Sequence, residues 1–142
     1  MDLSSNSLSH LPDNLSFLRS LEVLILSHNL FSSSTSIFNP NKLFVAFSSI
    51  PRLKRLDLSH NKFATIHIEE LLLKSTNKRI FKTLIEIDLS FNQVENHADL
   101  LPCLHLTHLN LINIIGNPFV LNASSQLNGK LIKPKVVREK NG

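Results

Sequence analysis

Apolar and polar positions follow one recurring pattern along most of this chain. The pattern is LxxLxLxxNx followed by an apolar residue, and its clearest copy runs from Leu53 to Phe63. Residues 21–31 and 84–94 match it position by position, residues 1–8 hold a truncated copy, and residues 109–119 hold a fifth with isoleucine in two of the leucine places. Five apolar positions and one asparagine recurring together indicate a stack of structural repeats, of which about three are needed for stability.

Each copy predicts one short β-strand followed by a bend. In the central LxL segment the two leucines point into a shared core and the residue between them points the other way, because side chains alternate along a strand. The asparagine stands where the chain turns away from the sheet, and its amide can satisfy backbone groups that would otherwise be buried unpaired. We therefore interpret five asparagines as a structural ladder: Asn6, Asn29, Asn61, Asn92 and Asn117.

The spacing of this ladder predicts inserted elements in the middle repeats. Subtracting 6, 29, 61, 92 and 117 in turn gives intervals of 23, 32, 31 and 25 residues. In the first insertion, Asn39 can cap a helix that begins at Pro40 and ends before Pro51. The buried face of this helix is expected to consist of Leu43, Phe44 and Phe47.

Two further helical segments are expected between the strands. The second insertion predicts a helical stretch over residues 68–74, followed by a basic loop. The shorter fourth repeat predicts a helical turn that begins near Ala98 and is ended by Pro102, because proline has no backbone N–H with which to continue a helix. The basic residues of the loop are Lys78, Arg79 and Lys82.

The LxxLxLxxN motif at 21–29, 53–61 and 84–92 resembles the leucine-rich repeat family, in its intracellular type. The resemblance implies an α/β solenoid, a short right-handed horseshoe with a parallel β-sheet on the concave face and helices or irregular turns on the convex face. Residues 1–121 are expected to form about five repeats, the first one truncated, and residues 122–142 a largely disordered basic tail. The segment 39–63 is also similar, more loosely, to repeat proteins of the X-ray radiation resistance-associated type.

The variable positions of the strands form the concave surface on which recognition is expected. Adjacent strands are about 4.8 Å apart, so Asp57 and Asp88 become neighbours, with Arg55 and Glu86 beside them. Exposed apolar groups around this polar centre favour a protein interface. The alternative is that LDLSxN is the family's commonest sequence at these positions and serves folding alone. The candidates for partner binding are Ile25, His28, Arg55, Asp57, His60, Glu86, Asp88 and Phe91.

The residue inventory argues against catalysis and bound cofactors. The sequence holds no glycine-rich phosphate loop and no nucleophile elbow, so we expect no enzyme activity, no cofactor and no small-molecule substrate. His28 and His60 are expected side by side, but zinc usually needs three or four ligands, and we expect no metal. The single cysteine, Cys103, lies in an apolar run and is interpreted as a core residue.

Several features favour an intracellular location, cytoplasmic or nuclear. The cysteine-rich caps that usually close secreted leucine-rich repeat proteins are missing from this sequence. The chain does not open with a basic stretch followed by an apolar one, and no apolar run is long enough to cross a bilayer. We therefore expect a protein that is neither exported nor inserted in a membrane.

Charge leaves a further hypothesis open. The formal net charge is +4, and residues 130–140 hold five lysines or arginines against Glu139 alone. Such a tail can bind phosphate by counterion release, although no aromatic residue is interleaved with the lysines.

The favoured function is a non-catalytic protein–protein interaction module. The alternatives are a truncated or structural fragment of a larger repeat protein without independent function, and weak nucleic-acid binding through the basic tail.

Overall fold

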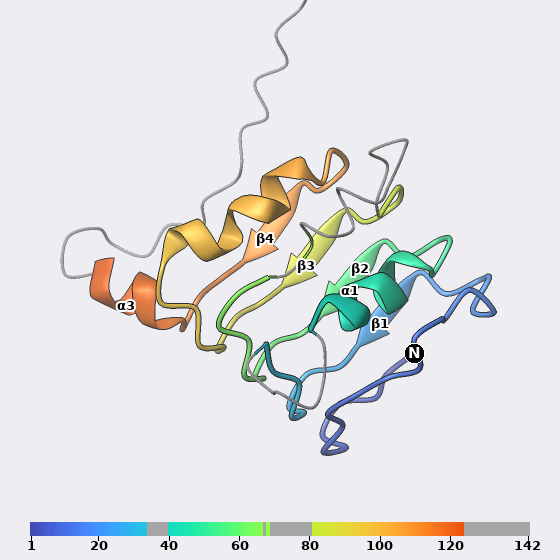
Figure 1. The fold of residues 1–142 in the computed structure, drawn as a ribbon, viewed down its shortest axis with the longest axis horizontal. Helices are drawn as coiled ribbons and strands as arrows, with labels where there is room; N and C mark the ends of the chain where they lie inside the picture. Colours follow the sequence, from blue (N-terminus) through green and yellow to red (C-terminus); the bar gives the residue numbers. More distant parts are fainter. Residues whose placement is uncertain (34–39, 67, 69–80, 124–142) are drawn as a thin grey trace, which may run out of the picture.

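A four-stranded parallel sheet carries the chain from one repeat to the next. The computed structural model describes residues 1–33, 40–66, 68 and 81–123. Spatial order follows sequence order (Figure 1), so each repeat packs against its sequence neighbours, as a repeat stack requires. The strands are β1 (Val23–Ile25), β2 (Arg55–Asp57), β3 (Glu86–Asp88) and β4 (Leu111–Asn113).

The strands pair in the register that the repeat pattern predicts. Val23 lies opposite Arg55 and Arg55 opposite Glu86, and the following positions of each strand pair in the same way. The truncated first copy joins the sheet through a bridge between Asp2 and Ile25. Equivalent positions of successive repeats therefore form columns across the sheet.

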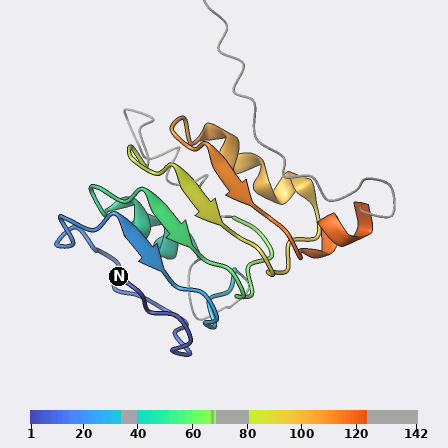
Figure 2. The same cartoon turned by 180° about the vertical axis from the view of Figure 1, so that it is seen from behind.

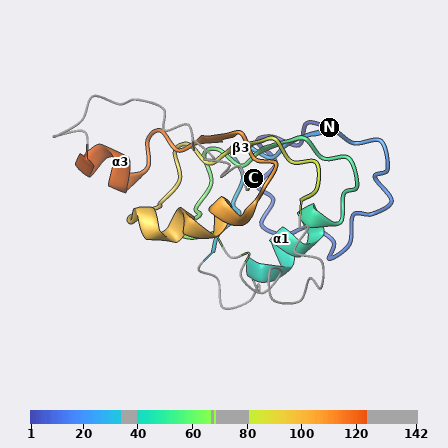
Figure 3. The same cartoon turned by 90° about the horizontal axis from the view of Figure 1, so that it is seen from above.

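Helices lie against one face of the sheet and leave the other face open. In Figure 3, α1 (Pro40–Ser48) and the 3-10 helix η1 (His97–His105) lie on the same side of the strands. Figure 2 shows the opposite face, where no described element covers the four strands. A short helix, α3 (Pro118–Ala123), follows β4, and it was not predicted from the sequence.

Helix α1 begins at Pro40, as predicted, because the fixed φ of proline suits the first helical position and its missing N–H is not needed there. Phe44 and Phe47 are buried, and their rings meet edge to face with centroids 5.8 Å apart. Leu43 is half-buried beside them. The predicted capping residue of this helix and most of the second insertion (69–80) lie outside the described residues.

The helical turn of the fourth repeat does not end at Pro102, so that prediction is wrong. Helix η1 continues through this proline to His105. Each turn of a 3-10 helix is closed by its own i→i+3 bond, so the loss of one donor leaves the next turns intact. The N–H of Leu106 still donates to the Cys103 carbonyl at 3.0 Å. Cys103 is buried, as expected of a core residue, and holds the helix against the core.

The asparagine ladder is confirmed for its four buried members, which join successive repeats by hydrogen bonds. Asn6 is exposed, and within the described part of the chain its side-chain amide donates only to the Ser4 carbonyl of its own repeat. Asn61 is representative, because its amide oxygen accepts from the Phe31 N–H of the preceding repeat at 3.1 Å. Its amide nitrogen donates at 3.0–3.1 Å to the carbonyls of Leu26, Leu58 and Ser59. Among the described residues, no buried side-chain nitrogen or oxygen lacks a hydrogen-bond partner. The other buried members make equivalent contacts and are Asn29, Asn92 and Asn117.

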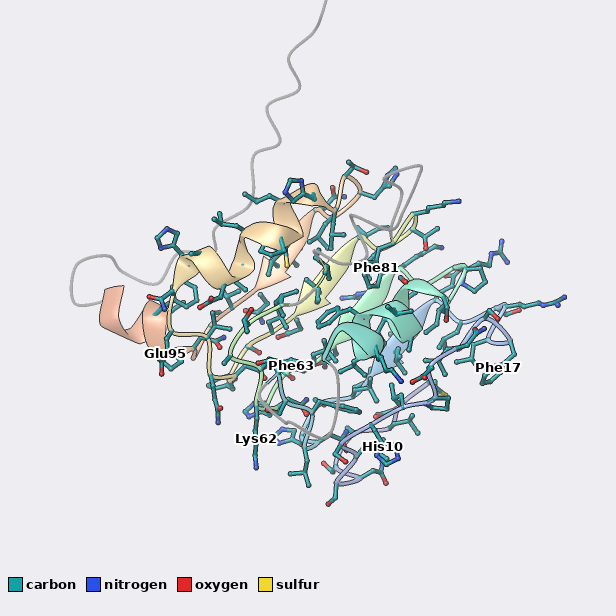
Figure 4. All side chains as sticks on the ribbon, in the orientation of Figure 1. His10, Phe17, Lys62, Phe63, Phe81 and Glu95 are labelled. Atoms are coloured by element: carbon teal, nitrogen blue, oxygen red, sulfur yellow. The ribbon has the colours of Figure 1, made fainter. Side chains whose placement is uncertain are left out.

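One continuous core connects the repeats. Its buried apolar side chains extend along the chain from Leu15 to Leu109. Figure 4 labels two of its phenylalanines, Phe63 and Phe81. Phe63 also contacts α1, since its ring lies 6.0 Å from that of Phe44. The core therefore fixes the sheet and the helices relative to each other.

Candidate functional site

The uncovered face of the sheet presents the residues that alternate with the core positions. In β1, β2 and β3 the middle residue is buried and the two flanking residues are partly or fully exposed. We name this surface the open sheet face, and it consists of Val23, Ile25, Arg55, Asp57, Glu86, Asp88, Leu111 and Asn113. A hollow of about 300 Å³ lies on it, lined by Val23, Ile25, Arg55, Leu56, Asp57, Glu86 and Asp88.

Arg55 and Glu86 form a two-point ion pair between β2 and β3. Arg55 Nε lies 2.9 Å from Glu86 Oε2, and Arg55 Nη2 donates to Glu86 Oε1 at 3.1 Å. The hydrogen bond and the negative charge of Glu86 raise the pKa of Arg55 above its ordinary value. Because the pair is open to water it contributes little to stability. The positive charge of Arg55 is therefore already neutralised by Glu86.

Asp57 and Asp88 each hold the turn that follows their strand. Asp57 Oδ1 accepts from the Ser59 N–H at 2.9 Å and from the Ser59 hydroxyl at 2.7 Å. Asp88 Oδ1 accepts the same pair of bonds from Ser90, at 2.8 and 2.6 Å. These contacts give the aspartates a folding role, which was the alternative left open by the sequence. That role uses one oxygen of each carboxylate and leaves both negative charges on the open sheet face.

Three aromatic rings stack where the strands end. The ring centroids of His28 and His60 lie 4.0 Å apart and those of His60 and Phe91 4.4 Å apart, with 12° between the planes in each pair. All three residues have φ of 52–54°, so the same left-handed turn places each ring in one column. We name these three residues the ring ladder. The column ends at Gly116 (φ +76°), where an added Cβ would lie 2.5 Å from the Phe91 ring, so only glycine leaves room for it.

The structure places the eight predicted binding residues in two groups. Five line the hollow, and the other three form the ring ladder. Two further lining residues, Val23 and Leu56, were not among the candidates. Val23 is 39% exposed, and the signal that could have identified it is its place in the same column as Arg55 and Glu86.

A second apolar surface lies at the far end of the sheet, beside η1. Leu101 and Leu104 of that helix are 50% and 63% exposed. The sequence did not predict this surface, because the predicted helix ended at Pro102 and therefore did not include Leu104. A hollow of about 230 Å³ on this surface is lined by His97, Leu100, Leu101, Leu104, Ile112, Ile114 and Phe119.

The described part of the chain contains no group of three or more His, Cys, Asp or Glu side chains placed so that they could hold a metal ion. The two histidines of the ring ladder fall short of the three or four ligands that zinc usually takes. None of the helices in this described part is long and apolar enough to cross a lipid bilayer.

Similarity to known proteins agrees with the repeat architecture. The family model for the Leucine Rich Repeat matches residues 52–74. The chain is also similar to the serine/threonine-protein kinase 11-interacting protein of Gallus gallus, with 29% identity over 124 residues that cover 83% of this chain and 12% of the relative. Together with the parallel sheet, these matches support a leucine-rich repeat family and a repeat fold. They do not confirm the finer resemblance to X-ray radiation resistance-associated proteins.

Proposed function

We propose that this chain is a non-catalytic leucine-rich repeat module that binds another protein through its open sheet face and acts inside the cell, in the cytoplasm or the nucleus. In a horseshoe this face is the concave one. The mechanism is rigid presentation, because the buried leucines and the asparagine ladder fix the strands before the partner arrives. The observation that carries the proposal is the face itself, a mixed polar and apolar surface with a hollow of about 300 Å³.

The composition of this surface supports a protein partner. Protein interfaces are enriched in aromatic residues and arginine, and they surround such anchors with polar groups. Arg55 lines the hollow together with three carboxylates, and Phe91 of the ring ladder, which follows the ends of the same strands, is 50% exposed. Leucine-rich repeat domains generally mediate protein–protein interaction.

The chicken relative bears the name of an interacting protein, which also supports a binding role. This chain spans only 12% of that relative's length. The kinase in the relative's name is therefore not assigned to this chain, and the proposal stops at a protein partner.

The test compares a variant of the open sheet face with a charge-matched control. Ile25→Lys with Glu86→Lys adds three positive charges to the face and leaves the serine contacts of both aspartates in place. The control, Asp13→Lys with Ser16→Lys, adds the same charge beside α1, where Asp13 pairs with Lys42 at 3.2 Å. Circular dichroism first confirms that both variants fold.

Partners captured from cells with the native chain are then quantified with each variant by mass spectrometry. We expect the face variant to lose a specific partner by about tenfold or more and the control to retain it, because like charges opposed across an interface are strongly unfavourable. Equal recovery with both variants would contradict the proposal.

A further inference from the structure

We propose that the open sheet face selects a basic segment of its protein partner and seats an arginine side chain of that segment in the hollow beside Asp57. This inference rests on the proposed function and names the chemistry of the partner. Three observations carry it. They are the negative charge of the hollow, an oxygen of Asp57 that accepts no hydrogen bond from the described residues, and the apolar and aromatic groups around the hollow.

The charge of the hollow is not balanced by the residues that line it. Three of these residues are carboxylates, and the single guanidinium, Arg55, is paired at two points with Glu86. The remaining lining residues are apolar, so the hollow offers Asp57 and Asp88 no cation other than Arg55, which is paired with Glu86. The formal net charge of the whole chain, by contrast, is +4. A basic segment of a partner complements this local negative charge.

Asn113 shows which kind of group fits beside these carboxylates. Its Nδ2 donates to Asp88 Oδ2 from the neighbouring strand at 2.8 Å. Asp57 has the same serine contacts as Asp88, but its neighbour on the next strand is Asp88 itself. A carboxylate cannot donate, so within the described residues Asp57 Oδ2 lacks the donor that Asp88 Oδ2 has. An N–H group of a partner can occupy that position.

The surroundings of the hollow favour arginine over lysine. A planar guanidinium carries several N–H donors and can bond to carboxylates on two strands about 4.8 Å apart, whereas an ammonium is compact and strongly hydrated. The methylene groups of the arginine can lie on Val23 and Ile25 at the apolar side of the hollow. Phe91 at the end of the ring ladder is half exposed, and it offers a ring to a neighbouring apolar or cationic side chain of the segment.

Three fluorescein-labelled peptides test this chemistry on the full chain. They share their length and apolar residues, and their central residue is arginine, lysine or citrulline, the neutral isostere of arginine. By fluorescence anisotropy, we expect the arginine peptide to bind about tenfold more tightly than the citrulline peptide. The lysine peptide should fall between them, and the arginine preference should shrink as salt is added. Equal binding of the arginine and citrulline peptides, or no binding at about 1 mM, would overturn the inference.

Two conservative substitutions test whether the preference for the arginine peptide arises at Asp57 and Asp88. Asp57→Asn keeps an oxygen for the Ser59 bonds and removes the charge, so the arginine-to-citrulline ratio should fall to about twofold. Asp88→Asn removes the second negative charge beside Asp57 and keeps an oxygen for the Ser90 bonds, so it should also lower the ratio. The matched control is Asp13→Asn, which removes a carboxylate beside α1 and should leave the ratio unchanged. An unchanged ratio in either folded variant of the hollow would overturn the assignment to Asp57.

The outcomes separate this inference from the proposed function. If Ile25→Lys with Glu86→Lys loses the captured partner while the three peptides bind alike, the open sheet face binds proteins but does not select arginine. If the arginine peptide is preferred while the captured partner is unaffected by that double variant, the hollow has the inferred chemistry, and the partner binds elsewhere on the chain.

Discussion

Asn61 and Asn6 occupy the same place in two repeats but differ in burial. Asn61 is 6% exposed and makes four hydrogen bonds to backbone groups, whereas Asn6 is exposed and its amide donates to the Ser4 carbonyl at 2.8 Å. Asn61→Ala leaves buried backbone groups without these partners, so we expect it to lower the free energy of unfolding by about 3–5 kcal/mol. Asn6→Ala should cost less than about 1 kcal/mol.

Urea denaturation followed by circular dichroism measures both costs. A cost below about 1 kcal/mol for the buried asparagine, similar to that of the exposed one, would contradict the role of the ladder in joining repeats.

A substitution at Gly116 tests whether the ring ladder ends there because the Phe91 ring needs the space of a Cβ. Gly116→Ala should lower the free energy of unfolding by about 2–4 kcal/mol, because a Cβ strains the left-handed backbone and also meets the Phe91 ring. In a Phe91→Ala background only the backbone cost of about 1 kcal/mol should remain. The double-mutant cycle from equilibrium unfolding measures the difference, and additive effects would show that the two residues do not touch.

At the residue scale, the sequence predicts neighbours but not their contacts. Aligned repeats place equivalent residues side by side, which is why the stacking of His28 and His60 could be expected. The bond from Asn113 to Asp88 depends on the rotamers of both side chains, and a repeat pattern does not encode rotamers. The space that Phe91 needs depends on the residue one repeat further on, which in this chain is glycine.

At the scale of elements, α1 owes its position to one buried face. Phe44 is 1% exposed, whereas its neighbour Val45 is 39% exposed. Phe44→Ala should therefore cost about 3–5 kcal/mol of unfolding free energy through the cavity it leaves, and Val45→Ala less than about 1 kcal/mol. Chemical denaturation of the two variants checks this, and equal costs would mean that α1 is not packed on the core as described.

The strands and α1 could be predicted because each has a sequence signal of its own, the LxL segment and the proline at the helix start. Helix α3 was missed although Pro118 supplies the same kind of signal. In the other full copies the ladder asparagine is followed by Leu30, Lys62 and Gln93, none of which signals a helix start, so the repeat pattern by itself predicts no helix at this position. The end of η1 was misplaced because the rule that proline ends a helix assumes α-helical i→i+4 bonding.

At the scale of the molecule, the continuous core predicts a single folding unit. Its buried side chains extend from Leu15 to Leu109, and each strand contacts the next. We expect one cooperative thermal transition by circular dichroism from a species that light scattering shows to be monodisperse. A broad transition accompanied by aggregation would mean that these repeats do not form a stable unit by themselves.

The central claim is that the open sheet face receives the partner. Hydroxyl-radical footprinting of the chain, with and without a captured partner, measures the exposure of individual side chains. Val23 of the open sheet face should lose reactivity when the partner binds, and so should His60 and Phe91 of the ring ladder beside it. Phe17, at the periphery in Figure 4 and 66% exposed, and Leu104 of η1, 63% exposed, should keep theirs. Protection of Phe17 or Leu104 with unchanged reactivity at Val23 and Phe91 would contradict the claim.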